Sequence, residues 1–589
     1  MKDFVKTMLA VICALVVVRL LAFLFFLVLF GSAVATGSSN VHIGKNSVLD
    51  LDLSAFEITE QTQDPSAQSY LSFSMLPQVG LRDAIQAVRT AATDPAIKFI
   101  LLRPDGLSAG MADIEELRKA LKEFHESGKA IVAYTENPGN GSYYLATVAD
   151  KVLMGSQHGG TPQLIGLSTQ LLFLKDILDK VGVNVQLIRH GKYKSAGEMY
   201  IRSSASQENL HQNRVLINSA WDAMSSVMAE SRDLSVDRLN ELIDGLAFVL
   251  PEDFLRYGLV DEVVDHETLL ARLCTLAQVE DADKFHLVPF ADYVTARVVP
   301  AIGGTQVAVL YADGEIVDGK DYGNVAGDRF VHEIDALRKD PSVKAVVLRV
   351  NSPGGSVSAS VKIRTALDEL QKVKPLVASY GNYAASGGYW ISNGCQKIYA
   401  DATTITGSIG VFSMIPEFSK VTKKVGVGIE TVGSNKHSDM FSLTRPFDAE
   451  ELASMQASVE DIYELFVNLV ATSRGKEPAE VDEIAQGRVW AGSDALNIGL
   501  VDEIGTLEDA IQYAAALADF HSSDEYKVVG YPQPLTLFEQ FLFSVGQTLD
   551  EPYILADTPF AALSGAVEAL KPGTPGAVFA RLPYAMEIR

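Results

Sequence analysis

The chain contains one segment twice, and this duplication constrains its fold more than any other feature. The stretch DPAIKFILLR over 94–103 recurs as DPSVKAVVLR over 340–349, a shift of 340 − 94 = 246 residues. Both copies also end alike, in YGLVDEV over 257–263 and IGLVDEI over 498–504. A repeat unit of 246 residues has the size of an ordinary domain. The sequence therefore predicts two tandem copies of one domain.

Each copy alternates short apolar strands with amphipathic helices. In the first copy the pattern predicts strands at 47–53, 99–102, 130–134 and 151–154, and helices at 113–125 and 141–148. In the second copy it predicts strands at 307–311, 346–350, 376–379 and 397–400, and helices at 362–370 and from Ser386 onward. Apolar strands separated by helices indicate an α/β fold with mostly parallel sheets.

A chain of 589 residues is too long for one core and indicates several domains. We divide it into an N-terminal membrane anchor at 1–36, a first repeat at 45–264, a largely helical connecting segment at 265–300, a second repeat at 301–518 and a C-terminal tail at 519–589. Repeated prolines interrupt the tail, apart from an amphipathic run at 535–545. The sequence does not decide whether the tail packs on the body, aids assembly or is partly disordered.

The N-terminal segment has the length and composition of a membrane span. Residues 7–30 are apolar except for Arg19, and about 20 apolar residues cross a bilayer. Lys2 and Lys6 precede the apolar run and favour a cytoplasmic N-terminus. We therefore expect one transmembrane helix with the body outside the cytoplasm. The sequence Ala-Val-Ala at 33–35 resembles a signal-peptide cleavage site, so a removed signal peptide is the alternative.

The overall composition argues against several classes of function. The net charge is −25, whereas nucleic-acid binding needs basic patches. Cys13, Cys274 and Cys395 are too few for a disulfide framework in a chain of this length, and their spacing resembles no zinc site. We expect buried free thiols, no metal and no other cofactor.

The two copies differ at the positions that bear chemistry. The shift of 246 residues aligns Asn140 with Ser386, and a shift of 424 − 180 = 244, taken from the KVGV segments that start at these positions, aligns Lys194 with Ser438. The second copy thus has a candidate nucleophile where the first has an amide, and the first has a lysine where the second has a serine. One complete Ser–Lys site per chain would require both copies.

Two glycine-containing motifs of the second copy suggest how a nucleophile would be presented. Ser386, in AASGGY, opens a helix directly after a strand, where helix N-terminal amides surround it; the alternative is a simple helix cap. The motif NSPGGS at 351–356 lets backbone N–H groups approach a ligand, as an oxyanion hole requires. The alternative for this motif is a structural turn.

The segment RHGKYKS at 189–195 supplies Lys192 and Lys194 as candidate bases. A lysine acts as a base only when burial lowers its pKa from about 10.4, and most lysines are solvated. Ser408, in TGSIG, lies just after a predicted strand and has the chemistry to hydrogen-bond and orient such an amine. Its alternative role is that of a turn serine.

Together these motifs resemble the long, duplicated form of the signal peptide peptidase A family, serine proteases of the ClpP/crotonase-like superfamily, over about residues 45–520. The resemblance implies that Ser386 is the nucleophile, that Lys194 rather than Lys192 is the base, and that Ser408 positions the amine. It places the oxyanion donors at the backbone N–H groups of two glycines, Gly354 and Gly387.

The expected function is therefore that of a membrane-anchored serine endopeptidase. By resemblance, its substrates are remnant signal peptides and other short hydrophobic peptides. The body would be a homotetramer on the periplasmic side of a bacterial inner membrane. Three alternatives stay open: a catalytically inactive crotonase-like scaffold, an acyl-CoA-binding protein on the same fold, and a Ser-His-Asp triad. The triad would need a distant histidine, because none occurs between Ser386 and His437.

Overall fold

The computed structural model describes residues 43–62, 76–280, 285–298, 303–533 and 578–581. The chain divides into two compact units, residues 1–45 and 46–589, and the helices and strands of the described residues lie in the second. The predicted anchor at 1–36 and the amphipathic run at 535–545 lie outside the described residues. Within the described ranges, no helix combines the length and apolar character needed to span a bilayer.

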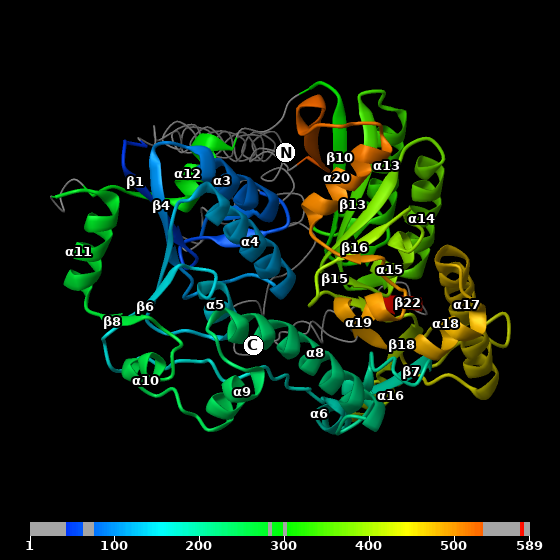
Figure 1. Ribbon diagram of the computed structural model, residues 1–589. Coiled ribbons are helices and arrows are strands. Elements are labelled where there is room, and N and C mark those ends of the chain that lie inside the picture. Colours follow the sequence, from blue (N-terminus) through cyan, green and yellow to red (C-terminus); the bar gives the residue numbers. More distant parts are fainter. Residues whose placement is uncertain (1–42, 63–75, 281–284, 299–302, 534–577, 582–589) are drawn as a thin grey trace, which may run out of the picture. The chain divides into compact units, whose positions relative to one another are not determined.

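The first repeat is built on a six-stranded sheet in which every pairing is parallel (Figure 1). Its strand order is β8 (Glu262–Val264), β6 (Lys151–Gly155), β5 (Ile131–Thr135), β4 (Ile97–Arg103), β1 (Ser47–Asp52) and β9 (Leu287–Pro289). The strands predicted near 47, 99, 130 and 151 are confirmed. Edge strand β9 comes from the segment expected to be a largely helical connection, so that segment also extends the first sheet.

The second repeat has an eight-stranded sheet with the same central arrangement. Its main order is β19 (Val489–Ala491), β17 (Ile405–Gly407), β15 (Leu376–Ala385), β13 (Val343–Ser352), β10 (Gln306–Asp313) and β21 (Lys527–Tyr531), and β16 (Ile398–Ala400) joins β15 to β20 (Glu503–Ile504). Only the β17–β19 pairing is antiparallel among these described strands. The predicted mixed α/β fold with mostly parallel sheets is confirmed. Strand β21 comes from the predicted tail.

Helices surround these sheets. In the first repeat and the connection they are α3 (Leu81–Thr93), α4 (Met111–Phe124), α5 (Asn140–Ala146), α6 (Lys175–Val181), α7 (Glu198–Ile201), α8 (Gln207–Ser231), α9 (Val236–Asp244), α10 (Pro251–Arg256), α11 (His266–Ala277) and α12 (Phe290–Arg297). In the second they are α13 (Gly327–Lys339), α14 (Val357–Gln371), α15 (Gly387–Ser392), α16 (Ser419–Lys424), α17 (Ala449–Arg474), α18 (Pro478–Ile484), α19 (Gly492–Asn497) and α20 (Leu507–Leu517). The helices expected near 113, 141, 362 and 386 are present as α4, α5, α14 and α15.

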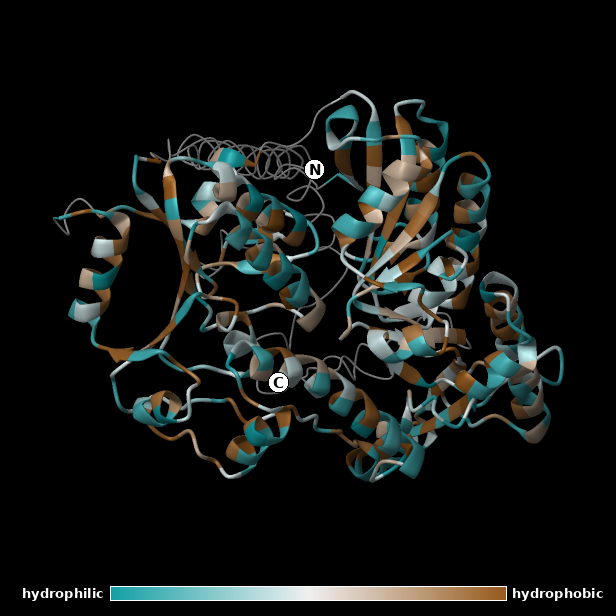
Figure 2. Ribbon diagram, in the orientation of Figure 1, coloured by the Kyte–Doolittle hydropathy of each residue, from teal (hydrophilic) through white to brown (hydrophobic). Residues whose placement is uncertain are grey.

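Side chains point alternately to the two faces of the second sheet, and this explains its two hydrophobic layers. Leu310 and Leu348 belong to the core cluster that α13 and α14 help to form, whereas Val309 and Val347 pack with α20. Successive residues of a strand point to opposite faces, so a sheet covered on both sides must be apolar throughout. Figure 2 shows hydrophobic residues concentrated along the central strands, while the covering helices are mixed.

A third sheet joins the two repeats, and the sequence did not predict it. Its order is β12 (Val325–Ala326), β11 (Ile316–Val317), β14 (Gly354–Ser356), β22 (Val578–Arg581), β18 (Val411–Glu417) and β7 (Asn184–His190). Strand β7 of the first repeat pairs antiparallel with β18 of the second along its full length, from Asn184↔Glu417 to His190↔Val411. Because Lys194 lies just beyond the end of β7, this pairing carries it to the second repeat. A separate two-stranded sheet pairs β2 (Glu57–Thr59) with β3 (Gln78–Gly80).

A buried ion network also joins the repeats. The guanidinium of Arg349, on β13, lies 2.8 Å from Glu60 and 2.7 Å from Glu116, two carboxylates of the first repeat. All three side chains are buried. Two further carboxyl groups, those of Asp113 and Glu115, lie near this network. Burial raises the pKa of each to about 7. The junction therefore holds more buried carboxyl groups than its arginine neutralises.

Candidate active site

Three segments far apart in sequence meet at the amine of Lys194. Its Nζ lies 2.9 Å from Ser386 Oγ, 3.0 Å from Ser408 Oγ and 3.1 Å from the carbonyl oxygen of Ser408. All three residues are fully buried. The structure thus brings together a serine and a lysine that are 192 residues apart, at hydrogen-bonding distance.

The backbone around Lys194 is held by the second repeat and by Arg189 of strand β7, in the first repeat. The N–H of Tyr193 donates to the carbonyl of Gln486 at 2.9 Å, and Arg189 donates to the carbonyl of Lys194 at 2.5 Å. Gly487 approaches so closely that a Cβ added to it would lie 2.5 Å from the Lys194 Cβ. Glycine is therefore required at 487 for the two backbones to pack, and this packing helps to seal the lysine from water.

Burial distinguishes the two candidate lysines. It lowers the pKa of Lys194 well below its ordinary value, because the charged ammonium loses its hydration. Lys192 is exposed, and its ammonium lies 5.3 Å from the centre of the Tyr193 ring. Of the two, only Lys194 has the environment of a neutral amine that accepts a proton.

Ser386 sits in a strained turn between β15 and α15. Its φ of 55° and ψ of −111° lie in a region that side-chain-bearing residues rarely adopt. Its N–H donates to the carbonyl of Gly407 at 2.8 Å, and the N–H of Trp390 donates to its carbonyl at 2.8 Å. The hydroxyl makes no helix-cap hydrogen bond, so the simple capping interpretation is wrong. Its side chain is directed to Lys194 instead.

Ser408 is also held in a left-handed conformation, with φ 49°. Its N–H donates to the carbonyl of Arg488 at 2.7 Å, and the N–H of Gly487 donates to the carbonyl of Ile409 at 2.8 Å. The segment at 486–488 therefore anchors both Ser408 and the Lys194 loop. Sequence reasoning missed this segment because an Ala-Gln-Gly-Arg stretch carries no chemical signature.

The two glycines implied as oxyanion donors lie side by side. Gly354 has φ 96°, and a Cβ added to it would lie 2.6 Å from the backbone nitrogen of Gly387. Its own N–H donates to Ser352 Oγ at 3.2 Å. Gly387 directly follows Ser386 at the start of α15. This arrangement allows a carbonyl oxygen to reach backbone donors next to the candidate nucleophile.

The counterparts of Ser386 and Lys194, each in the opposite copy, form no second pair. The side-chain oxygen of Asn140 accepts from the N–H of Gly166 at 3.0 Å, and its amide donates to the Gly166 carbonyl at 2.9 Å. Asn140 therefore holds a loop in place. Ser438, the counterpart of Lys194, is exposed. Within the described ranges, this duplication yields one Ser–Lys contact.

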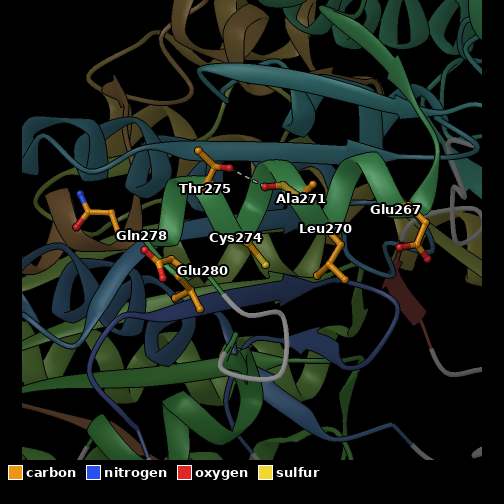
Figure 3. Close-up of a pocket in the computed structure, with 8 residues that line it drawn as sticks. Glu267, Leu270, Ala271, Cys274, Thr275, Gln278 and Glu280 are labelled. Atoms are coloured by element: carbon orange, nitrogen blue, oxygen red, sulfur yellow. Dashed lines mark hydrogen bonds between the residues drawn. The ribbon is translucent and has the colours of Figure 1, made fainter.

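A pocket elsewhere is separate from this site. About 720 Å³ in volume, it runs along one face of α11 (Figure 3) and is lined by Glu267, Leu270, Ala271, Cys274, Thr275, Gln278, Val279 and Glu280. The hydroxyl of Thr275 donates to the carbonyl of Ala271 at 2.8 Å, an ordinary bond within a helix.

Cys274 and Cys395 are buried free thiols, as predicted, and Cys13 lies outside the described residues.

One cluster of potential metal ligands has an ionic explanation. Ligand atoms of His437, Asp448 and Glu451 lie within 4.8 Å of one another. Glu451 receives hydrogen bonds at 2.7 Å from Arg445, and it lies 3.1 Å from the His437 ring. Its acidic charge is therefore already paired.

Comparison with known proteins identifies the family. The family described as Peptidase family S49 matches residues 123–280 and 368–521, one segment in each repeat and more than half of the chain together. The chain belongs to peptidase family S49. It is therefore a serine protease with a duplicated S49 domain, and the predicted enzyme class is confirmed.

Individual S49 relatives match most of the chain. Protease 4 of Salmonella typhi is 36% identical over 528 residues, which cover 84% of this chain and 83% of the relative. Protease 4 of Haemophilus influenzae is 34% identical over 528 residues, covering 85% and 83%. The chloroplastic serine protease SPPA of Arabidopsis thaliana is 31% identical over 520 residues, covering 86% and 74%. The similarity thus extends through both copies.

Proposed function

We propose that this S49 protease is a membrane-anchored endopeptidase that uses a Ser386–Lys194 dyad. The observation that carries the proposal is the 2.9 Å approach of Lys194 Nζ to Ser386 Oγ, with both side chains buried. An amine whose pKa is lowered by burial is neutral and accepts a proton from a serine hydroxyl. A serine needs such a neighbour, because its own hydroxyl is a weak nucleophile.

The reaction then follows from the positions of these groups. Lys194 takes the proton of Ser386 as Oγ attacks the substrate carbonyl, and backbone N–H groups of Gly354 and Gly387 stabilise the oxyanion. The ammonium returns the proton to the departing amine, which leaves an acyl-enzyme. Lys194 then takes a proton from water, and the resulting hydroxide releases the acyl group. Ser408 holds the amine in line during both steps.

The remaining features of the proposal rest on the apolar N-terminus and on family resemblance. Residues 1–36 would anchor the chain in a bacterial inner membrane, with a ClpP/crotonase-like homotetramer on the periplasmic side. Substrates would be remnant signal peptides and other short hydrophobic peptides, and no metal or other cofactor would be required.

Labelling with a fluorophosphonate tests the dyad directly. We expect mass spectrometry to locate the adduct on Ser386, and we expect Lys194→Ala to abolish labelling in a folded protein. Ser386→Ala is the control for adducts at other serines. Absence of an adduct from folded wild-type protein would contradict the proposal. Binding of acyl-CoA by that unlabelled protein, measured by calorimetry, would favour the acyl-CoA alternative, and no binding would favour an inactive scaffold.

A further inference from the structure

A glutamine of helix α8 holds the residues on both sides of Lys194, in a segment that we call the lysine turn (residues 193–195). The side-chain amide of Gln212 donates to the carbonyl of Tyr193 at 3.1 Å and to the hydroxyl of Ser195 at 2.9 Å. An amide nitrogen carries two N–H donors, and both are used here. Gln212 and Ser195 are 2% and 3% exposed. The lysine turn is therefore fixed to α8 by buried hydrogen bonds.

The same face of α8 is attached to the second repeat. Leu216, four residues after Gln212, belongs to a buried hydrophobic cluster with Ala385, the residue that directly precedes Ser386. Three residues further on, the hydroxyl of Ser219 donates to a carboxylate of α19 at 2.7 Å. Residues spaced by four and three positions lie on one face of a helix. One face of α8 therefore contacts the lysine turn and packs beside the strand that presents Ser386.

Helix α8 also reaches the carbonyl of Lys194 itself, through a buried carboxylate. Arg189 donates to this carbonyl, and the carboxylate of Glu198 accepts from the same guanidinium at 3.3 Å. Glu198, which is 1% exposed, also accepts from the amide of Asn209 on α8 at 3.2 Å. The two attachments, one through Gln212 and one through Glu198, bind the lysine turn to the same helix.

The copy without the lysine base lacks this glutamine. Helices α8 and α17 each begin at a side-chain N-cap, Ser206 and Asp448, and these caps align the two helices with a shift of 448 − 206 = 242 residues. The shift places Ser454 at the position of Gln212, and Ser454 is exposed. The buried glutamine therefore occurs in the copy that supplies the amine.

We propose that Gln212 is a positioning residue for the base, and that through it α8 sets the distance between the Lys194 amine and the Ser386 hydroxyl. The inference rests on the proposed function of these two residues. Gln212 acts through the lysine turn rather than on the reacting atoms. Without its hydrogen bonds the turn moves away from α8, so the amine lies farther from Ser386 and gains contact with water. Hydration favours the protonated amine, which cannot act as a base.

The pH dependence of a Gln212→Met variant tests the proposal, because methionine has a similar size and no N–H donor. We expect kcat to fall about 10- to 100-fold with little change in KM, and the ionisation in kcat/KM to move to higher pH by about half a unit or more. Met224→Ala is the control: Met224 is 1% exposed and lies farther along α8. This control should unfold at a lower temperature and keep the wild-type ionisation. An equal change of ionisation in both variants would overturn the proposal.

A milder variant covers the case in which Gln212→Met does not fold. Ser195→Ala removes one of the two acceptors of Gln212, so the ionisation should move in the same direction by a smaller amount. Wild-type enzyme that cleaves peptides, beside folded Gln212 or Ser195 variants with wild-type kcat and ionisation, would overturn this inference alone. Wild-type enzyme that cleaves no peptide and whose Ser386 resists fluorophosphonate would overturn the proposed function and this inference together.

Discussion

The amine of Lys194 meets Ser408 at two atoms, 3.0 Å from its hydroxyl and 3.1 Å from its carbonyl oxygen. These two contacts fix the direction of the amine toward the third partner, Ser386. We therefore expect Ser408→Ala to lower kcat by about 10²-fold with little change in KM, since misplacing a reacting group by about 1 Å has an effect of that size. A Ser408→Thr variant, which keeps a hydroxyl, should recover part of the rate. Full activity in a folded Ser408→Ala protein would show that the carbonyl alone positions the amine.

Replacing Ser386 by alanine should remove the peptidase activity. The expected decrease in kcat is at least about 10⁴-fold, since loss of a nucleophile removes the acyl-enzyme route. Thermal unfolding should show that the variant is folded. Asn140→Ala is the matched control in the other copy: it loses the hydrogen bonds to Gly166 but should retain most of the activity. Substantial turnover by Ser386→Ala would exclude it as the nucleophile.

The two neighbouring lysines should behave differently. Lys194→Ala should be inactive because it has no amine. Lys194→Arg should also be inactive, because arginine keeps its proton at accessible pH. The exposed Lys192 can be replaced by alanine with little effect. Peptidase assays of the purified variants decide between them, and an inactive Lys192→Ala beside an active Lys194→Ala would show that Lys192 is the base.

The activity of wild-type enzyme should rise with pH through one ionisation well below the ordinary lysine value. Burial lowers the pKa of Lys194, so the neutral, proton-accepting form grows as pH rises through that lowered pKa. The measurement is kcat/KM between pH 5 and 10 under conditions where chemistry limits the rate. A profile without any ionisation in this range would count against a lysine base.

Gly487→Ala should reduce both stability and activity. The added methyl group would lie 2.5 Å from the Cβ of Lys194, and the φ of 77° is unfavourable for alanine. Gly475→Ala is a matched control, because its φ of 61° is similar but nothing lies within 4 Å of the added methyl. We expect the control to lose about 1–2 kcal/mol and to keep full activity. Equal effects of the two substitutions would show that backbone strain, rather than contact with Lys194, is responsible.

The buried carboxyls at the junction predict that stability increases as pH falls from about 7 toward 5. The pKa values of Asp113 and Glu115 are raised to about 7 in the folded protein, whereas unfolded carboxyls titrate near 4. The folded state therefore binds more protons than the unfolded state within this window. Denaturant titrations of Glu115→Gln should show a weaker dependence on pH than wild type. Glu126→Gln, at an exposed position, is the control and should leave the pH dependence of stability unchanged. If Glu115→Gln has the same pH dependence as wild type, Glu115 is not the source of that dependence.

The sequence was sufficient to predict what depends on local pattern. Apolar runs gave the central strands, and the duplication showed that Ser386 and Lys194 belong to different copies. The third sheet was not predictable in the same way, because β7 pairs with a strand more than two hundred residues away and its burial alternates irregularly. Strand β22 has four residues and follows a stretch rich in proline. Such a short strand forms only where two neighbours already provide its hydrogen-bonding partners, which is information that a linear pattern lacks.

The packing of Gly487 on Lys194 also sets an order of events during synthesis. The ribosome makes Lys194 first, and the residues that enclose its side chain, from Ser386 to Gly487, come much later. Until they arrive, the amine stays hydrated and protonated, as any surface lysine does. Under the mechanism we propose, a growing chain therefore has no working base while its hydrophobic segments, and those of neighbouring nascent proteins, are still unfolded. Because the site is divided between the two copies, this mechanism cannot start proteolysis until most of the chain has been synthesised.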